Sequence, residues 1–387
     1  MATAKVPLSD LLSLVSDPCR VDPRGSYPNL GIYSFARGVF GKPPIDGAQT
    51  SATTLYRVRR GQFIYSRLFA FEGAYAIVPE EMDGVFVSNE YPTFDVDQDH
   101  LLPRYLHWLF QRRDVWRQVA VGAKGMGDRR QRVHPDKVLS YRIDLPSVGD
   151  QHRIVEKLDR VAALVDERRN AIEAAERETQ ALLLKAFQRA IDGAPLRPMA
   201  EVAPLVRRPV EIDLDAAYPE LGVRSFGRGT FHKPDLLGAD LSWQKLFLVQ
   251  QGDLVFSNIK AWEGAFAVAG PDDHGRVGSH RYLTCVPTQG LATADFIWFY
   301  LQTSEGLGKV QSASPGSADR NRTLGQGALE AITVPTPPIG HQDWFDRLQA
   351  KVRQARTIRA NTAQDVEALI PAMLHEIFIF DGKAVAA

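Results

Sequence analysis

One passage of this sequence occurs twice, and the repeat limits the fold more than any other feature does. The run YPNLGIYSFARGVFGKP begins at Tyr27, and the run YPELGVRSFGRGTFHKP begins at Tyr218, 191 residues further on. Identical residues continue at this offset without an insertion, among them Pro7 and Pro198, Glu72 and Glu263, Ser88 and Ser279, Gln151 and Gln342, and Phe187 and Phe378. The chain is therefore two copies of one unit of about 190 residues, and each copy is large enough to form a domain.

The composition agrees with two globular domains. The 387 residues exceed one ordinary core, and the hydrophobic share of 44% and charged share of 24% are typical of a soluble protein. No apolar run is long enough for a transmembrane helix, and the first residues lack the pattern of a secretory signal. Cys19 and Cys285 are too few for a disulfide framework or a four-ligand zinc site. We expect a cytoplasmic protein with no membrane partner.

Each copy begins with about 140 residues of mixed α+β character. Short runs rich in β-branched and aromatic residues predict strands, such as GQFIYSRLF, AYAIV and GVFVSNEYPTFDV in the first copy and KLFLVQ, DLVFSN and YLTCV in the second. Helical stretches follow these runs, namely PRYLHWLFQRRDVWRQV and ADFIWFYLQTSEGLGKV. The sequence thus predicts two similar α+β lobes.

Each lobe is followed by a long helical segment with a heptad spacing of apolar residues. The segment that starts near Asp150 contains no proline and stops at Gly193, and at 1.5 Å per residue it predicts a helix of roughly 60 Å. In the second copy, Pro371 predicts a kink or a shortened helix. The predicted seams consist of Ile154, Leu158, Val161, Val165, Ile172 and Leu182 in the first helix and Phe345, Leu348, Val352, Val366, Leu369 and Met373 in the second.

One such seam alone would indicate a core helix of its own domain, but two, each following a similar lobe, favour pairing with each other. Antiparallel pairing returns the second helix to the first lobe and gives the molecule a pseudo-twofold axis. The predicted parts are two lobes at residues 1–149 and 193–340, two spacer helices at 150–192 and 341–380, and a tail at 381–387. Two lobes joined by helices of fixed length suit the reading of two separated sites on DNA.

The junction between lobe and helix resembles a known family. IDLPSVGDQHRIVEKLDRVAALVDERRNAIE is similar to the specificity subunits of type I restriction–modification systems, in which a proline-bearing strand end and a glutamine lead into a long spacer helix. ITVPTPPIGHQDWFDRLQAKVRQAR is a weaker version, and the order lobe, helix, lobe, helix covers essentially the whole chain. In that family each lobe is a target-recognition domain, and the helices form an antiparallel coiled-coil spacer.

The resemblance implies a non-catalytic subunit that recognises a gapped, two-part sequence in double-stranded DNA, one half-site per lobe. It also implies partners: two methyltransferase subunits, to which restriction and translocation subunits can be added. No cofactor, catalytic residue or metal site is expected in this chain. The sequence has no phosphate-binding loop or amino-methyltransferase motif, and its nine histidines lack metal-ligand spacing.

A lobe that reads DNA needs cations for the phosphates and planar donors for the bases, and a net charge of zero leaves room for a local basic groove. We take as the first candidate the loop GAKGMGDRRQR and its counterpart QSASPGSADRNR, in which small flexible residues are followed by Asp-Arg; a solvated charged turn is the alternative. The candidates in these loops are Lys124, Arg129, Arg130 and Arg132 in the first copy and Lys309, Arg320 and Arg322 in the second.

Further candidates lie outside these loops. Arg37 and Lys42 recur as Arg228 and Lys233 in the repeated opening passage, where phosphate contact and a shared packing turn are equally good readings. Arg67 is replaced by Asn258, and these side chains suit guanine and adenine respectively. The repeated Glu-Gly-Ala turn is read as structural.

Two other classes of function stay open. The duplication could build a two-lobed enzyme around a central cleft, which would require acids or histidines repeated between the copies. The best repeated acids are Glu72 with Glu263 and Asp128 with Asp319. The chain could also be a scaffold that uses the helices without reading DNA.

Overall fold

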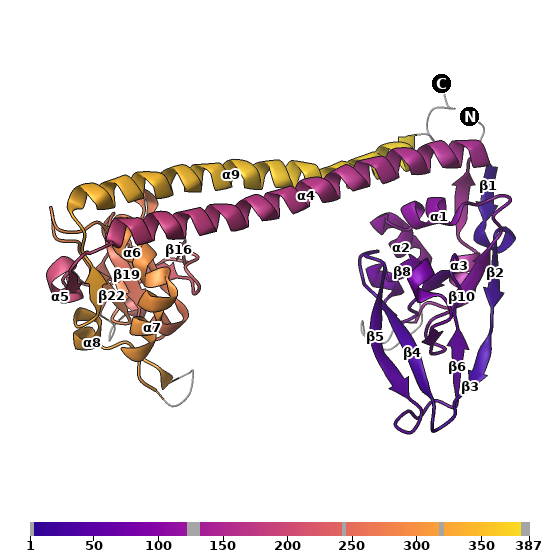
Figure 1. The fold of residues 1–387 in the computed structure, drawn as a ribbon, viewed down its shortest axis with the longest axis horizontal. Coiled ribbons are helices and arrows are strands. Elements are labelled where there is room, and N and C mark those ends of the chain that lie inside the picture. Colours follow the sequence, from indigo (N-terminus) through magenta and orange to yellow (C-terminus); the bar gives the residue numbers. More distant parts are fainter. Residues whose placement is uncertain (1–3, 122–131, 242–244, 317–320, 381–387) are drawn as a thin grey trace. The chain divides into compact units, whose positions relative to one another are not determined.

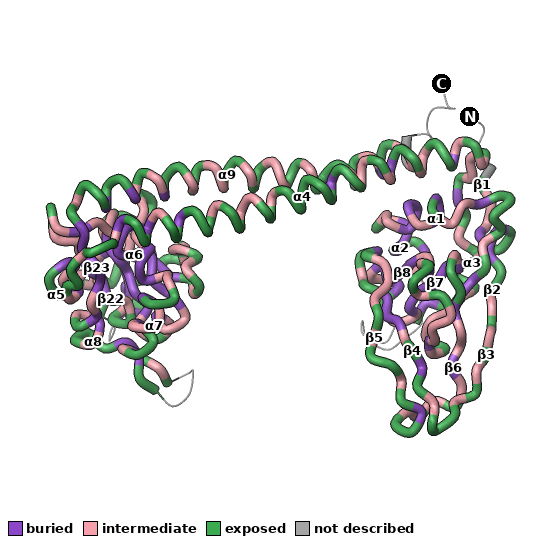
Figure 2. Tube along the Cα trace, in the orientation of Figure 1, coloured by how far each residue is buried: buried purple, intermediate pink, exposed green. Residues whose placement is uncertain are grey.

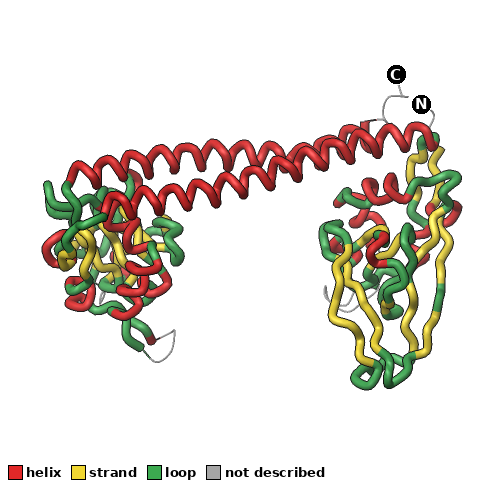
Figure 3. The backbone as a smooth tube through the Cα atoms, viewed as in Figure 1, coloured by secondary structure: helices red, strands yellow, loops and turns green. Residues whose placement is uncertain are grey.

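The computed structural model describes residues 4–121, 132–241, 245–316 and 321–380. The chain divides into two compact units, the first formed by residues 1–172 with 360–387 and the second by residues 173–359. Each unit contains one lobe and one stretch of each of two long helices, α4 (Val148–Ile191) and α9 (Ile339–His375) (Figure 1). The predicted α+β character is confirmed, because in each unit the strands belong to the lobe and the long helices carry none (Figure 3).

The first lobe has two main sheets and a two-stranded ribbon. The four-stranded sheet has the order β2-β10-β7-β8, the five-stranded sheet has the order β3-β6-β9-β4-β5, and β1 pairs with β11. All pairings are antiparallel except that of β4 with β9. The strands are β1 (Ala4–Pro7), β2 (Leu12–Val15), β3 (Pro18–Arg20), β4 (Ser26–Ile32), β5 (Val39–Asp46), β6 (Thr54–Arg57), β7 (Phe63–Tyr65), β8 (Tyr75–Ile77), β9 (Phe86–Val87), β10 (Thr93–Val96) and β11 (Arg142–Leu145).

Aromatic packing holds this lobe together. The rings of Phe63 and Phe110 lie 4.8 Å apart, and those of Tyr75 and Phe110 lie 4.7 Å apart, between the four-stranded sheet and the short helices. These helices are α1 (Pro103–Leu109), α2 (Arg113–Ala120) and α3 (Pro135–Leu139). The predicted helical stretch is thus two helices, because Phe110 and Gln111 form a turn between them.

The second lobe repeats this arrangement with shorter strands. Part of the four-stranded sheet recurs as β20-β19-β22. The five-stranded sheet recurs as β13-β18-β21 together with the pairs β14-β17 and β15-β16, and the ribbon recurs as β12-β23. The strands are β12 (Leu196–Pro198), β13 (Pro209–Val210), β14 (Ala217–Tyr218), β15 (Leu221–Val223), β16 (Thr230–His232), β17 (Leu236–Leu237), β18 (Leu246–Leu248), β19 (Leu254–Ser257), β20 (Phe266–Val268), β21 (Val277–Ser279), β22 (Tyr282–Cys285) and β23 (Thr333–Pro335). The helices are α5 (Met199–Val202), α6 (Ala294–Gln302), α7 (Ser304–Ser312) and α8 (Gln326–Glu330).

The long helices are antiparallel within each unit. In the first unit, Leu158 packs with Leu374, and Arg169 further along α4 lies 4.0 Å from Glu367, which is earlier in α9. In the second unit, Arg356 pairs with Glu176 and donates to Gln180, and the rings of Phe187 and Phe345 are 5.3 Å apart. Figure 2 shows few buried residues along the helices compared with the lobes, so much of the helical surface is open to solvent.

Most of the predicted seam faces inward, but two members do not. Leu182 is 58% exposed while its neighbour Leu183 is buried, and Leu369 is 47% exposed while Leu374 is buried. A straight α-helix has 3.6 residues per turn, so its inward face drifts away from a strict seven-residue repeat. Near the lobe the buried residues of α4 are therefore Leu183, Phe187 and Ala190. The remaining predicted positions are buried or half-buried: Ile154, Leu158, Val161, Val165, Ile172, Phe345, Leu348, Val352, Val366 and Met373.

Pro371 was predicted to kink or shorten the second helix, and the helix does not end there. The helix α9 continues through Pro371 to His375, and a π-helical turn follows at Glu376–Phe380. Proline removes one backbone hydrogen bond. The residues on either side of it, Ile370 and Leu374, pack with Leu158 and Trp108, so tertiary contacts keep this stretch helical.

A buried glutamine fixes the start of each long helix to its lobe. Gln151 accepts a hydrogen bond from the Leu102 backbone N–H at 2.9 Å and donates to the carbonyls of His100 and Pro146 at 2.8 and 3.0 Å. Gln342 makes the same three bonds at the repeat offset, with Thr293, Leu291 and Pro337. Both side chains are fully buried. The glutamine is therefore repeated because one buried amide satisfies three backbone groups.

Candidate nucleic-acid interface

The repeated opening passage forms a turn that rests on the Glu-Gly-Ala turn in both lobes. The Ser34 hydroxyl donates to Glu72 Oε2 at 2.7 Å, and Ser225 donates to Glu263 Oε2 at 2.8 Å. The Lys260 ammonium, 2.7 Å from Glu263, contributes most to holding the pKa of that carboxyl below its usual range, and the Ser225 hydroxyl adds to the effect. These acids therefore anchor a turn, as the structural reading of the Glu-Gly-Ala sequence requires.

The backbone of the opening passage is also fixed by this contact. Phe35 N–H donates to Glu72 O at 2.7 Å, and Phe226 N–H donates to Glu263 O at 2.9 Å. Phe35 and Phe226 both have left-handed backbone angles, with φ of 62° and 63°. The left-handed phenylalanine is consequently held in the same way in the two lobes, and its side chain is exposed in each.

The four cations that the two copies of the opening passage share divide into two kinds. Arg37 and Arg228 are exposed, and their guanidinium groups lie over Tyr33 and Phe226 at 5.0 and 5.8 Å. Lys42 and Lys233 are half-buried: Lys42 donates to the Tyr91 hydroxyl at 3.1 Å, and Lys233 pairs with Glu220 at 2.8 Å. The arginines thus lie on the open side of the turn, and the lysines are tied into the lobe.

Arg67 and Asn258 occupy matching sites with the same backbone contacts. Arg67 N–H donates to Glu90 O and its carbonyl accepts from Val133, while Asn258 N–H donates to Arg281 O and its carbonyl accepts from Leu324. Every one of these partners is related by the repeat offset. Arg67 Nε and Asn258 Oδ1 are both buried without a hydrogen-bond partner. Buried polar atoms are nearly always paired, so two unpaired atoms at corresponding places call for a reason.

The residues that accept the backbone N–H of Arg67 and of Asn258 differ in charge between the lobes: Glu90 in the first and Arg281 in the second. Glu90 in the first lobe receives both of its side-chain contacts from Arg132, at 3.1 and 3.2 Å. The matching residue in the second lobe is Arg281, which is exposed. The sequence repeat already contains this change from an acid to a base. Its place beside positions 67 and 258 follows only from the folded chain.

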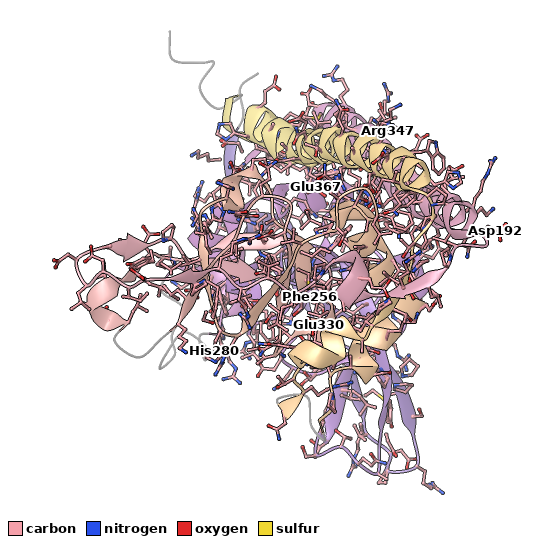
Figure 4. All side chains as sticks on the ribbon, turned by 90° about the vertical axis from the view of Figure 1, so that its left-hand side faces the viewer. Asp192, Phe256, His280, Glu330, Arg347 and Glu367 are labelled. Carbon is pink, nitrogen blue, oxygen red and sulfur yellow. The ribbon has the colours of Figure 1, made fainter. Side chains whose placement is uncertain are left out.

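A cavity of about 320 Å³ in the second lobe is lined by Ser257 and Ile259, the two chain neighbours of Asn258, and by Arg281. Its lining includes His280, labelled in Figure 4, and four residues that the first lobe also has at the repeat offset: Lys233, Ser257, Ser279 and Tyr282. The other lining residues differ between the copies: Glu220, Ile259, His280 and Arg281 correspond to Asn29, Leu68, Asn89 and Glu90. A shared frame with changed side chains is what two related but different recognition surfaces need.

The structure describes only some of the loop cations that were predicted to contact DNA. Lys124, Arg129, Arg130 and Arg320 lie outside the described residues. Arg132 is engaged by Glu90, and Arg322 donates to the carbonyls of Ser314 and Gln311 and lies over the Trp262 ring at 5.0 Å. Lys309 donates to Thr333 and pairs with Glu305. These three side chains brace the lobe surface, and their role toward DNA stays a prediction.

Within the described residues, no group of three or more histidine, cysteine or acidic side chains could hold a metal ion. No helix in the described part of the chain is long and apolar enough to span a bilayer.

Solved structures match this chain over almost its full length. The HsdS subunit from Thermoanaerobacter tengcongensis is 19% identical, with 97% of this chain and 96% of that chain covered and a TM-score of 0.57. A chain from a study of complex assembly and conformational transition of the type I R-M system is 18% identical, with 97% of each chain covered and a TM-score of 0.69. The type I restriction–modification S subunit from M. genitalium is 10% identical over 98% and 96% of the two chains, with a TM-score of 0.50.

No family model matches the sequence, and no curated protein matches it. The likeness is therefore one of fold: this chain has the fold of HsdS specificity subunits.

Proposed function

We propose, from this shared fold as the premise, that the chain is the DNA specificity subunit of a type I restriction–modification system. Each lobe recognises one half of a gapped, two-part sequence in double-stranded DNA. The antiparallel helices fix the gap and bind two methyltransferase subunits, to which restriction and translocation subunits can be added. The chain itself carries no catalysis, so the chemistry belongs to its partners in the cytoplasm.

The observation that carries this proposal is the paired construction of the two lobes. Arg67 and Asn258 have the same backbone partners at the repeat offset, yet their side chains differ, and so do the flanking residues Glu90 and Arg281. A duplicated catalytic site would keep its reactive groups, whereas two readers of different half-sites keep the frame and change the groups that face the bases.

Purification from the source cell tests the proposal. A tagged full-length chain is expected to co-purify with a methyltransferase that transfers methyl groups to genomic DNA taken from a strain lacking this gene. The modified sites are expected to share one gapped motif. Partner subunits that methylate DNA without any shared motif would instead support a scaffold that does not read sequence.

A further inference from the structure

Phe35 and Phe226 combine an unfavourable backbone with an exposed ring. Both have φ near +60°, a region that residues with a bulky side chain avoid. Among the described residues, the other non-glycine residue with positive φ is Ala36, next to Phe35. Phe35 is 52% exposed and Phe226 is 70% exposed. The Phe35 ring lies 6.5 Å from that of Trp116, but more than half of each phenylalanine remains exposed, so burial of the ring offsets the backbone strain only in part.

The lobe itself imposes this conformation. Two successive N–H groups donate to two successive carbonyls in each copy: Phe35 and Ala36 to Glu72 and Gly73, and Phe226 and Gly227 to Glu263 and Gly264. The glycines Gly73 and Gly264 are themselves left-handed, with φ of 81°. A glycine at position 35 or 226 would relieve the strain and keep these bonds. The phenylalanine is thus present for its ring, because the turn alone does not need it.

The surroundings of the rings are cationic. The guanidinium of Arg113 lies 6.0 Å from the centre of the Phe35 ring, and that of Arg228 lies 5.8 Å from the centre of the Phe226 ring. Arg37 and Arg224 are exposed on the same turns. An apolar pocket on a protein would have to bury these guanidinium groups along with the ring. A duplex offers bases to the ring and phosphates to the arginines.

We propose that Phe35 and Phe226 are wedge residues, each of which presses its ring against a base step of the half-site read by its own lobe while the neighbouring arginines bind phosphates. This inference rests on the proposed function and adds a ligand contact to it. Apolar side chains on DNA-binding surfaces act in this way when they are held rigidly. The left-handed turn supplies the rigidity in both lobes.

The test uses the complex purified from cells and a duplex that carries the motif methylated by the wild-type complex. Phe35→Ala and Phe226→Ala are each expected to weaken binding about tenfold or more, in line with the loss of one base contact. Phe35→Leu is expected to keep part of the affinity, because leucine can also act as a wedge. Leu14→Ala and Leu237→Ala are matched controls, since these leucines are 55% and 58% exposed elsewhere on the same lobes.

Phe35→Gly and Phe226→Gly separate folding from binding. They are expected to unfold at the same temperature as the wild type or higher, because strain is relieved, and yet to bind DNA as weakly as the alanine variants. Alanine and glycine variants that bind within twofold of the wild type would overturn the proposal. Loss of co-purifying subunits would overturn it too, because the rings would then contact protein. A wild-type complex without any preferred duplex would refute the proposed function and the wedge together.

Discussion

Asn258→Arg combined with Arg281→Glu is expected to change one half of the methylated motif and to leave the other half as it was. The double substitution gives the second lobe the pair that the first lobe has in Arg67 and Glu90. Asn258 and Arg281 share a backbone hydrogen bond, as Arg67 and Glu90 do. Asparagine pairs best with adenine and arginine with guanine, and each such pair discriminates by about 1–3 kcal/mol.

The second change in this variant serves to avoid a like-charge contact. Asn258→Arg alone would add a guanidinium beside Arg281, whereas Arg281→Glu restores the neighbour that position 67 has. The base-resolution methylation pattern of cells carrying the double variant measures the result. Arg281→Lys is the control, because it keeps the charge and is expected to keep the motif. A motif that stays unchanged in both halves would refute base reading at position 258, and one altered in both halves would refute one half-site per lobe.

Gln151→Leu is expected to destabilise the first unit by about 3 kcal/mol or more, and Gln342→Leu the second unit by a similar amount. Leucine fills a similar volume but leaves the three backbone groups that face the buried glutamine without this partner in each case: Leu102 N–H with the carbonyls of His100 and Pro146, and Thr293 N–H with the carbonyls of Leu291 and Pro337. Each such group costs about 1–3 kcal/mol when it is left without a partner.

Hydrogen exchange on the full chain measures this effect lobe by lobe. Gln151→Leu is expected to raise exchange in β7 and β10, and Gln342→Leu in β19 and β22, because each glutamine anchors its own lobe. His152→Leu and His341→Leu are the controls, since both histidines are exposed next to the glutamines. Equal effects of the glutamine and histidine variants would show that the three buried bonds do not determine stability.

The sequence was sufficient to predict the α+β character of the lobes and the long helices, because the repeat runs without an insertion. Strand runs such as GQFIYSRLF and DLVFSN lie on β7 and β19, and the heptad spacing marks α4 and α9. The sequence did not predict which residues of each long helix face inward near its end. Leu182 and Leu369 fit a seven-residue repeat, but the helices turn every 3.6 residues, so their inward faces pass to Leu183 and Ile370. Local spacing cannot reveal which neighbour a lobe will cover.

The candidate site was harder to predict, because a basic residue in the sequence can already be paired within its own lobe and is then not free to bind a ligand. Lys309 was predicted to lie in a basic loop, but it belongs to helix α7 and its ammonium contacts Thr333 and Glu305. Glu90 and Arg281 could not be predicted from the sequence, since only the folded chain places them beside positions 67 and 258. Phe35 and Phe226 were visible as repeated residues, but their positive φ and exposure depend on contacts with turns about 38 residues away.

A base-resolution methylation map of the source cell, recorded with and without this gene, tests the specificity role most directly. We expect one gapped, two-part motif to lose its methylation when the gene is removed and to regain it when the gene is restored. The two halves of that motif would then be assigned to the two lobes by the Asn258 variant. Identical maps from cells that express the methyltransferase partner would contradict the account, because the partner would then find its sites without this chain.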